Sequence, residues 1–361
     1  MKLFHKTSIF VSAFLFCSLA FSQPTPDLSR FKSPQLPSKY FEVLGSLDGM
    51  SVVNKFGENP DIDTVDGFEN IWDAGSSYVP PTQARIHNVA STAVADAGTL
   101  VESGTVDSAT STTITDAVAT FVTNSTAVGD FVLNDTKNAY GIVSAVTSET
   151  VLAVEKWVSP TSGLESSVPV AGDSFRVVTT ASTGIALFFV QGLDANGLGI
   201  SEFIITNGTS NVATTKSYLR QFRAKSFLAG SGGETAGTIS STAVTDATVS
   251  AQVIGANNQT LMAVYTVPSN KIGLLTHWWG AISKKGNASS GIHLKIGDLD
   301  SIAYIQQARA MSASGSSEFH HEFDLPKILA PSTDIFIEAD TDTNNTGIAA
   351  GFTIVLFDKV D

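Results

Sequence analysis

A series of short apolar segments fills the C-terminal part of the chain and leaves few folds open to it. From Thr238 onward, segments such as TLMAVYTV, GIHLKIG and DIFIEAD alternate with turns rich in Gly, Asn, Asp and Pro. Short runs of this kind, bounded by turn residues, are typical of β-strands. Beyond residue 22 no segment keeps an apolar period of 3.6 residues over the length of a helix. The sequence therefore predicts an all-β protein with antiparallel β-sandwich or jelly-roll-like domains.

Charge and cysteine content limit the partners of the chain. Its 34 acidic and 21 basic residues give a formal net charge of −13. Because nucleic acids need a basic surface, we expect no nucleic-acid partner. The single cysteine, Cys17, lies near the N-terminus, so the rest of the chain has no disulfide and no cysteine metal ligand.

The first 22 residues have the form of a secretory signal. Lys2 and Lys6 precede an apolar run from Ile9 to Phe21, and small residues precede Gln23. The run is shorter than the roughly 20 residues that a membrane span needs. The pattern predicts cleavage after Ser22. Residues 23–53 follow as a Pro-rich arm and a short apolar lead-in.

The remaining sequence predicts three β units. Residues 106–178 contain several very short strands and are predicted to form a small β-barrel module inserted into a larger domain. Residues 54–105 and 179–235 form the first β domain around it, in which Asn207-Gly208 is a strong hairpin signal. Residues 236–361 form the C-terminal β-sandwich.

The stretch Asn54–Pro81 is the least repetitive part of the chain. It mixes aromatic and acidic residues with Gly and Pro, a mixture that argues against a regular helix or strand. We therefore predict an ordered loop. The loop is either an ordinary surface loop or a segment that docks on a partner, with Phe56, Trp72 and Tyr78 as its aromatic anchors.

A fourth candidate contact residue is Trp279. In a strand, Trp278 and Trp279 face opposite sides of the sheet, which puts one in the core and the other at the surface. The exposed tryptophan is a candidate for an interface or for stacking on a sugar.

The sequence does not match the known metal-binding and catalytic motifs that we compared with it. Counting from Asp61, the sixth residue is Asp66 and the twelfth is Trp72, where an EF-hand has Gly and Glu. His320 and His321 are adjacent in a predicted strand and so point to opposite faces. The G-x-S-x-G motif is absent from the sequence. We predict no catalytic, cofactor-binding or metal-binding residue and a protein that is not an enzyme. A polysaccharide hydrolase stays open as a further alternative to the two functions given below. Such an enzyme uses two paired carboxylates, and the distance between them is set by the fold and not by the sequence spacing.

Several separated motifs resemble virion structural proteins of tailed bacteriophages, particularly marine ones. They are KFGENPDIDT, IWDAGSSYVPPT, VQGLDANGLGISEFIITNGTSNVATTKSYLRQFRA, AGSGGETAGTI and QTLMAVYTVPSNKIGLLTHWW. The piece with NSTAVGDFVLNDT and AGDSFRVV is similar to a small β module that recurs in such proteins. The resemblance covers most of residues 54–280. It implies a structural role on the particle, without catalytic residues, and leaves head decoration, tail and fibre open.

Two functions follow from the sequence. The first is a non-enzymatic structural or attachment protein of a phage particle, located in the virion. Its partners would be other virion proteins or its own copies, since exposed strand edges need covering, and a host surface glycan is a further candidate. The alternative is a secreted or cell-surface bacterial adhesin or carbohydrate-binding β protein. The signal-like segment favours this alternative, because a phage protein assembles in the cytoplasm.

Overall fold

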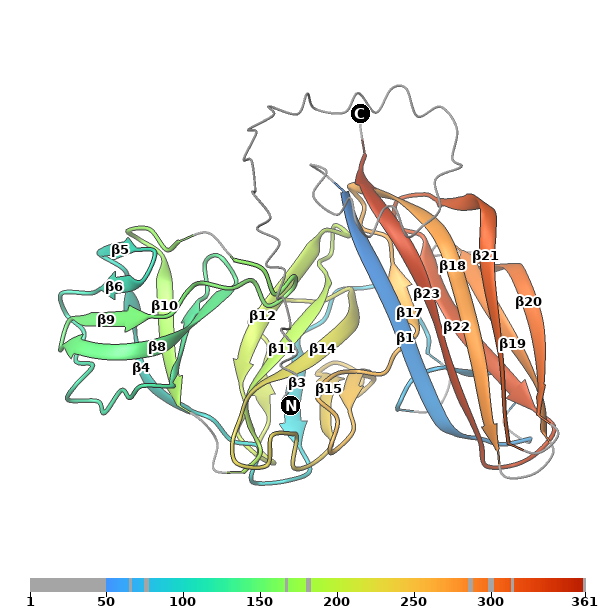
Figure 1. The fold of residues 1–361 in the computed structure, drawn as a ribbon, viewed down its shortest axis with the longest axis horizontal. Coiled ribbons are helices and arrows are strands. Elements are labelled where there is room, and N and C mark those ends of the chain that lie inside the picture. Colours follow the sequence, from blue (N-terminus) through green and yellow to red (C-terminus); the bar gives the residue numbers. More distant parts are fainter. Residues whose placement is uncertain are drawn as a thin grey trace, which may run out of the picture. The chain divides into compact units, whose positions relative to one another are not determined.

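The computed structural model describes residues 50–64, 67–74, 78–165, 168–179, 183–284, 288–297, 302–312 and 315–359. In these ranges the chain forms 23 strands and no helix (Figure 1). The predicted all-β class with antiparallel sandwich sheets is confirmed. None of the described residues forms a helix long and apolar enough to cross a membrane. The signal-like segment 1–22 and nearly all of the predicted arm and lead-in, 23–53, lie outside the described residues.

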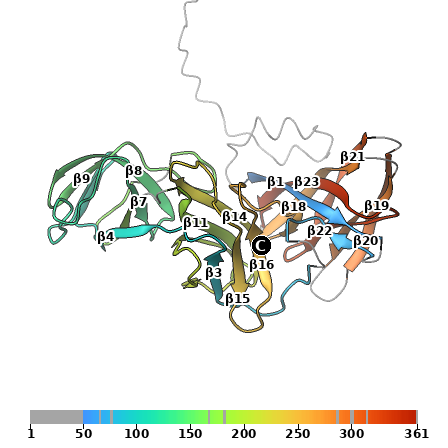
Figure 2. The same ribbon diagram turned by 90° about the horizontal axis from the view of Figure 1, so that it is seen from below.

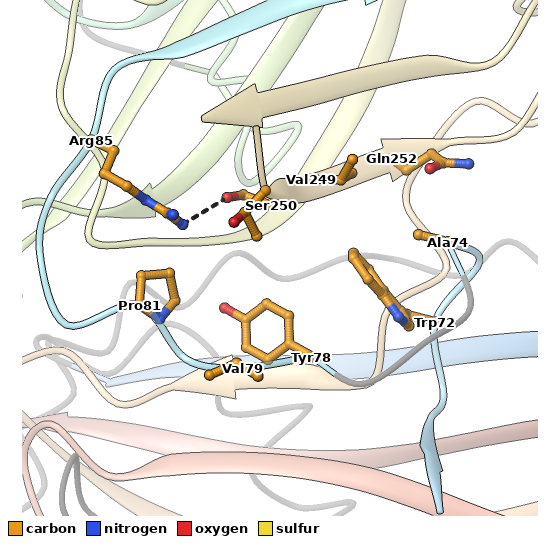
Figure 3. A pocket seen from close by; sticks show the side chains of 10 residues that line it. Trp72, Ala74, Tyr78, Val79, Pro81, Arg85, Val249, Ser250 and Gln252 are labelled. Atoms are coloured by element: carbon orange, nitrogen blue, oxygen red, sulfur yellow. Dashed lines mark hydrogen bonds between the residues drawn. The ribbon is translucent and has the colours of Figure 1, made fainter. Parts of the chain in front are cut away.

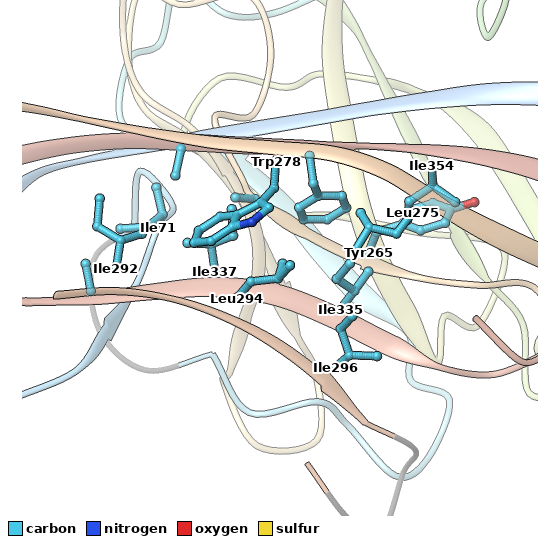
Figure 4. Packing of buried hydrophobic residues seen from close by; sticks show 14 of the residues in the cluster. Ile71, Tyr265, Leu275, Trp278, Ile292, Leu294, Ile296, Ile335, Ile337 and Ile354 are labelled. Carbon is cyan, nitrogen blue, oxygen red and sulfur yellow. The ribbon is translucent and has the colours of Figure 1, made fainter. Parts of the chain in front are cut away.

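The C-terminal sandwich consists of two sheets. The first, called here the β18 sheet, has the order β1 (Met50–Ile62), β23 (Thr346–Asp358), β18 (Lys271–Lys284) and β21 (Gly315–Leu329). The second has the order β17 (Val264–Thr266), β22 (Asp334–Thr341), β19 (Ala288–Gly297) and β20 (Ile302–Ser312), and β2 (Glu69–Asn70) also pairs with β22. Their inner faces enclose the largest apolar cluster, in which Trp278 is completely buried (Figure 4).

The middle sandwich is built around a second core. One sheet has the order β12 (Gly199–Ile205), β11 (Ile185–Leu193) and β14 (Arg220–Ala229). The other has the order β13 (Val212–Ala213), β3 (His87–Ser91), β15 (Ile239–Ala243) and β16 (Val249–Val253). Residues 185–190 of β11 are an uninterrupted apolar run because the two faces of the strand join different clusters, one with Phe188 and one with Phe189.

A seven-stranded sheet forms the inserted module. Its order is β4 (Thr99–Thr105), β10 (Ser174–Thr179), β7 (Phe131–Asn134), β8 (Ala139–Ser148), β9 (Val151–Val154), β6 (Thr113–Thr115) and β5 (Ser108–Thr110). All seven strands come from residues 99–179, and they lie together in both views (Figures 1 and 2). Phe121, Trp157 and Phe175 are in its core.

Strand pairing divides the chain differently from the predicted domains. Strands β15 and β16 follow residue 236, yet they pair in the sheet of β3, so the predicted boundary separates strands of the middle sandwich. Strand β1 pairs with β23, at the other end of the chain. The spacing of apolar runs locates strands but does not say which strands pair, and this is why the boundaries differ.

The prediction of a loop from Asn54 onward is wrong for residues 54–62, which belong to β1. Among the described strands, β1 is an edge strand that pairs only with β23, and Pro60 lies where the register shifts between Asn59 and Ile62. Proline is tolerated at such a place because no ladder hydrogen bond is lost. Gly57 is required there, since a Cβ would collide with the carbonyl of Ile71.

Candidate functional site

The four candidate contact residues fall in two separate places. Trp72 and Tyr78 line a small pocket beside β16, whereas Phe56 and Trp279 lie on the outer face of the β18 sheet. The structure therefore does not gather them into one docking loop.

The pocket beside β16 has an aromatic corner. Trp72 is 3% exposed and Tyr78 is 8% exposed. Their ring centroids are 5.9 Å apart at an angle of 77°, and both pack with Met262 in a buried cluster. The cavity has a volume of about 220 Å³ and is also lined by Pro81 and Ser250 (Figure 3). With so little exposed surface, these two aromatic residues act first as internal packing.

The side chain of His87 contacts Ser250 at this pocket. The Nε2 atom of His87 lies 2.8 Å from the Ser250 hydroxyl. Burial, and then the charge of Arg85, lowers the pKa of His87 to about 4. Arg85 is itself paired with Asp246 at 2.6 Å. No carboxylate in the described part of the chain accepts a hydrogen bond from the Nδ1 atom of His87.

A buried ion pair connects this region to the C-terminal sandwich. Arg220 donates two hydrogen bonds to Asp334, of 3.1 and 2.9 Å. It also donates to the carbonyl of Pro81, and Thr266 donates to Asp334. Burial raises the pKa of Tyr78, which lies near this pair, to about 12. The stretch that includes Pro81 is thereby fixed to strands of both sandwiches.

The outer face of the β18 sheet carries a line of residues across its four strands, and three of these residues have aromatic rings. Phe56 is opposite Gly351 in the pairing of β1 with β23. Gly351 is opposite Trp279, and Trp279 is opposite His320. Directly opposite residues share a face, so these side chains form one line, which we call the aromatic row.

Close contacts hold the rings of the row in place. A Cβ at Gly351 would lie 2.8 Å from Nε1 of Trp279, which shows that the indole lies against the glycine backbone. The Trp279 and His320 rings are stacked, with centroids 6.4 Å apart and an interplanar angle of 28°. His277 stacks on His320 at 5.6 Å. At the other end, the Arg223 guanidinium lies 5.8 Å from the centre of the Phe56 ring.

Glutamates surround the aromatic row. Glu318 and Glu322 are exposed on β21, on either side of His320, and Glu58 is exposed on β1. Burial, and then the charge of His320, lowers the pKa of His277, against the smaller opposing effect of Glu322. The face thus combines half-buried rings with carboxylates that accept hydrogen bonds. Over the described ranges no group of three or more His, Cys, Asp or Glu side chains is arranged to hold a metal ion.

The sequence prediction missed most of this face. It placed Phe56 in a loop and did not connect His320 with Trp279. The alternation of exposed and half-buried residues along β21 could have put Glu318, His320 and Glu322 on one face. No local signal could have placed Gly351 beneath Trp279, because that contact depends on the pairing of β18 with β23.

Asp73 gives the fold a predictable dependence on pH. Burial raises its pKa from 3.8 to about 7, and hydrogen bonds from the backbone oppose this less strongly. The folded state therefore binds the proton more tightly than the unfolded chain, and stability falls as the pH rises from about 4 to about 7. We expect Asp73→Asn to be more stable than the parent by roughly 2–4 kcal/mol at pH 8 and nearly equal at pH 4. Urea unfolding at both pH values measures this, and equal shifts at the two pH values would contradict it.

Comparisons with known proteins leave the family open. No family model matches the chain, and no curated protein matches it. Two structures of infectious bursal disease virus, of the Gx and Gt strains, align over 79% of this chain and 80% of theirs at 8% identity. Their TM-scores are 0.15 and 0.14, values too low to carry an argument about fold or function. The likeness to tailed-phage proteins stays a prediction from the sequence.

Proposed function

We propose that the chain is a non-enzymatic structural and attachment protein of a phage particle. The observation that carries the proposal is the aromatic row, a set of half-exposed rings fixed on the outer face of a four-stranded sheet. An open flat face suits contact with a large partner better than the turnover of a small enclosed substrate. The sequence motifs shared with phage structural proteins support the same proposal.

Hydrogen bonds between the two sandwiches also support a structural role. Besides the Arg220–Asp334 pair, Lys55 of β1 donates to the carbonyl of Phe222 in β14. Arg223 of β14 donates to the carbonyl of Asn54 at 2.9 Å. These hydrogen bonds are made by residues of several strands. We therefore infer that the stretch Asn54–Pro81, which the sequence offered as a docking segment, holds the two sandwiches together.

Immunoelectron microscopy tests the particle role. An antibody raised against the full chain is applied to purified phage particles from the source that encodes it, with an antibody to an unrelated secreted protein as the control. We expect gold label at a fixed position on the particles. Unlabelled particles that contain no peptide of this chain by mass spectrometry would overturn the proposal.

The second candidate is a secreted adhesin, favoured by the half-buried Trp279 together with the signal-like residues 1–22. N-terminal sequencing of the chain from culture supernatant free of particles tests it. A mature protein that begins at Gln23 supports secretion. A chain that keeps residues 1–22 and stays with the cells speaks against this candidate.

A further inference from the structure

We propose that the aromatic row and its glutamates form a binding site for a neutral polysaccharide, with a pyranose ring stacked on Trp279. The proposal deepens the attachment role above by naming the ligand class. It concerns the purified chain, so it can be tested independently of the particle.

Trp279 is the tryptophan that the fold offers to a ligand. The other three tryptophans, Trp72, Trp157 and Trp278, are buried in three different clusters. Trp279 is half-buried, and its indole lies against Gly351. Any larger residue at position 351 would push the ring away from the sheet. The glycine therefore lets the ring lie low on the sheet, where part of the indole surface stays exposed to solvent.

Neighbouring rings lie on both sides of Trp279, along a line that crosses the strands. His320 is stacked beside Trp279 on the adjacent strand, and Phe56 lies two strands away on the other side. Strands are about 4.8 Å apart, so Phe56 and Trp279 are separated by roughly 10 Å across the sheet. An extended chain of flat sugar rings that crosses the strands would meet His320 and Trp279 in succession and then reach Phe56, whose ring lies against the Arg223 guanidinium. This geometry favours a ribbon-like polysaccharide over a single sugar.

The polar groups disfavour an acidic ligand and offer acceptors to sugar hydroxyls. Exposed Glu58, Glu318 and Glu322 provide carboxylate oxygens that accept hydrogen bonds from sugar hydroxyls. The same three charges, on a chain with a net charge of −13, repel acidic polysaccharides. A purely apolar partner would leave the carboxylates desolvated and without donors, which is costly.

A second copy of the chain fits this face less well. In a two-fold dimer the same patch contacts itself. The glutamates of one copy would then lie near those of the other, and like charges across an interface are unfavourable. Neutral sugar hydroxyls meet no such repulsion.

Titration of the full-length protein tests the site. The probes are cellohexaose and N-acetylchitohexaose, both neutral, and hexagalacturonate, which is acidic. Binding is followed by calorimetry and by tryptophan fluorescence, which reports on the face because the other tryptophans are buried. We expect at least one neutral probe to bind and to change the fluorescence, and the acidic probe not to bind.

Variants show whether Trp279 carries the binding. We expect Trp279→Ala to weaken binding of the neutral probe by about tenfold or more, as for a central aromatic contact. Leu164→Ala is the matched control, because it removes an exposed apolar side chain in the inserted module, and its affinity should equal that of the parent. Thermal unfolding of each variant confirms that it is folded.

Three results would overturn the proposal. They are no binding of either neutral probe, unchanged affinity of folded Trp279→Ala, and a fall in molar mass of Trp279→Ala by light scattering, which would identify a contact between copies. Binding with unlabelled particles would remove only the particle role, whereas labelled particles without binding would remove only the sugar site.

Discussion

We expect Arg220→Ala to lower the free energy of unfolding by about 3–5 kcal/mol, because it leaves a buried carboxylate without its counter-ion. The side chains of Arg220 and Asp334 are 1% and 6% exposed, so bulk water does not solvate the Asp334 carboxylate in the parent protein. The carbonyl of Pro81 loses its donor as well. Only Thr266 would still donate to Asp334 among the contacts described above. Chemical denaturation at pH 7 measures the loss.

A double variant separates the ion pair from the space that it fills. Replacing both partners with apolar residues, Arg220→Met with Asp334→Leu, removes the charges together. Since paired removal of a buried ion pair is often nearly neutral, we expect this protein to be more stable than Arg220→Ala alone. A loss of less than about 1 kcal/mol for Arg220→Ala is what a surface salt bridge contributes. Such a result would contradict the view that this pair fixes the stretch that includes Pro81 to both sandwiches.

Much of the fold could be predicted because strands leave a local signal. The apolar run of β11 is visible in the sequence since both of its faces are buried. Trp278 and Trp279 had to face opposite sides of a strand, and the structure places the first in the core and the second on the outer face. These features depend on the alternation of side chains between the two faces of a strand, a period of two residues that is visible in the sequence.

The rest depends on contacts between distant segments. Pro60 indicates a loop by every local rule, yet it lies in β1, because an edge strand tolerates a missing donor. Met50 pairs with Phe357 near the other end of the chain, and no spacing rule links them. The aromatic row has the same origin, since Phe56, Gly351 and Trp279 come together only when three strands pair in a given register.

Trp72 is the predicted contact residue whose role changes most. The sequence offered it as an anchor for a partner, whereas the structure buries it against Tyr78 and Met262. We expect Trp72→Ala to lower the free energy of unfolding by about 3–5 kcal/mol, the cost of emptying a large aromatic site in a core. The measurement is urea unfolding of purified full-length protein.

Trp279→Ala is the matched control, because it removes the same side chain from a half-buried site on the outer face. We expect it to cost about 1 kcal/mol or less, since surface substitutions rarely cost more. A large loss for Trp72→Ala and a small one for Trp279→Ala would assign the first tryptophan to folding and leave the second for recognition. If the order were reversed, the outer face would be a structural surface, and the pocket beside β16 would become the better candidate for a binding site.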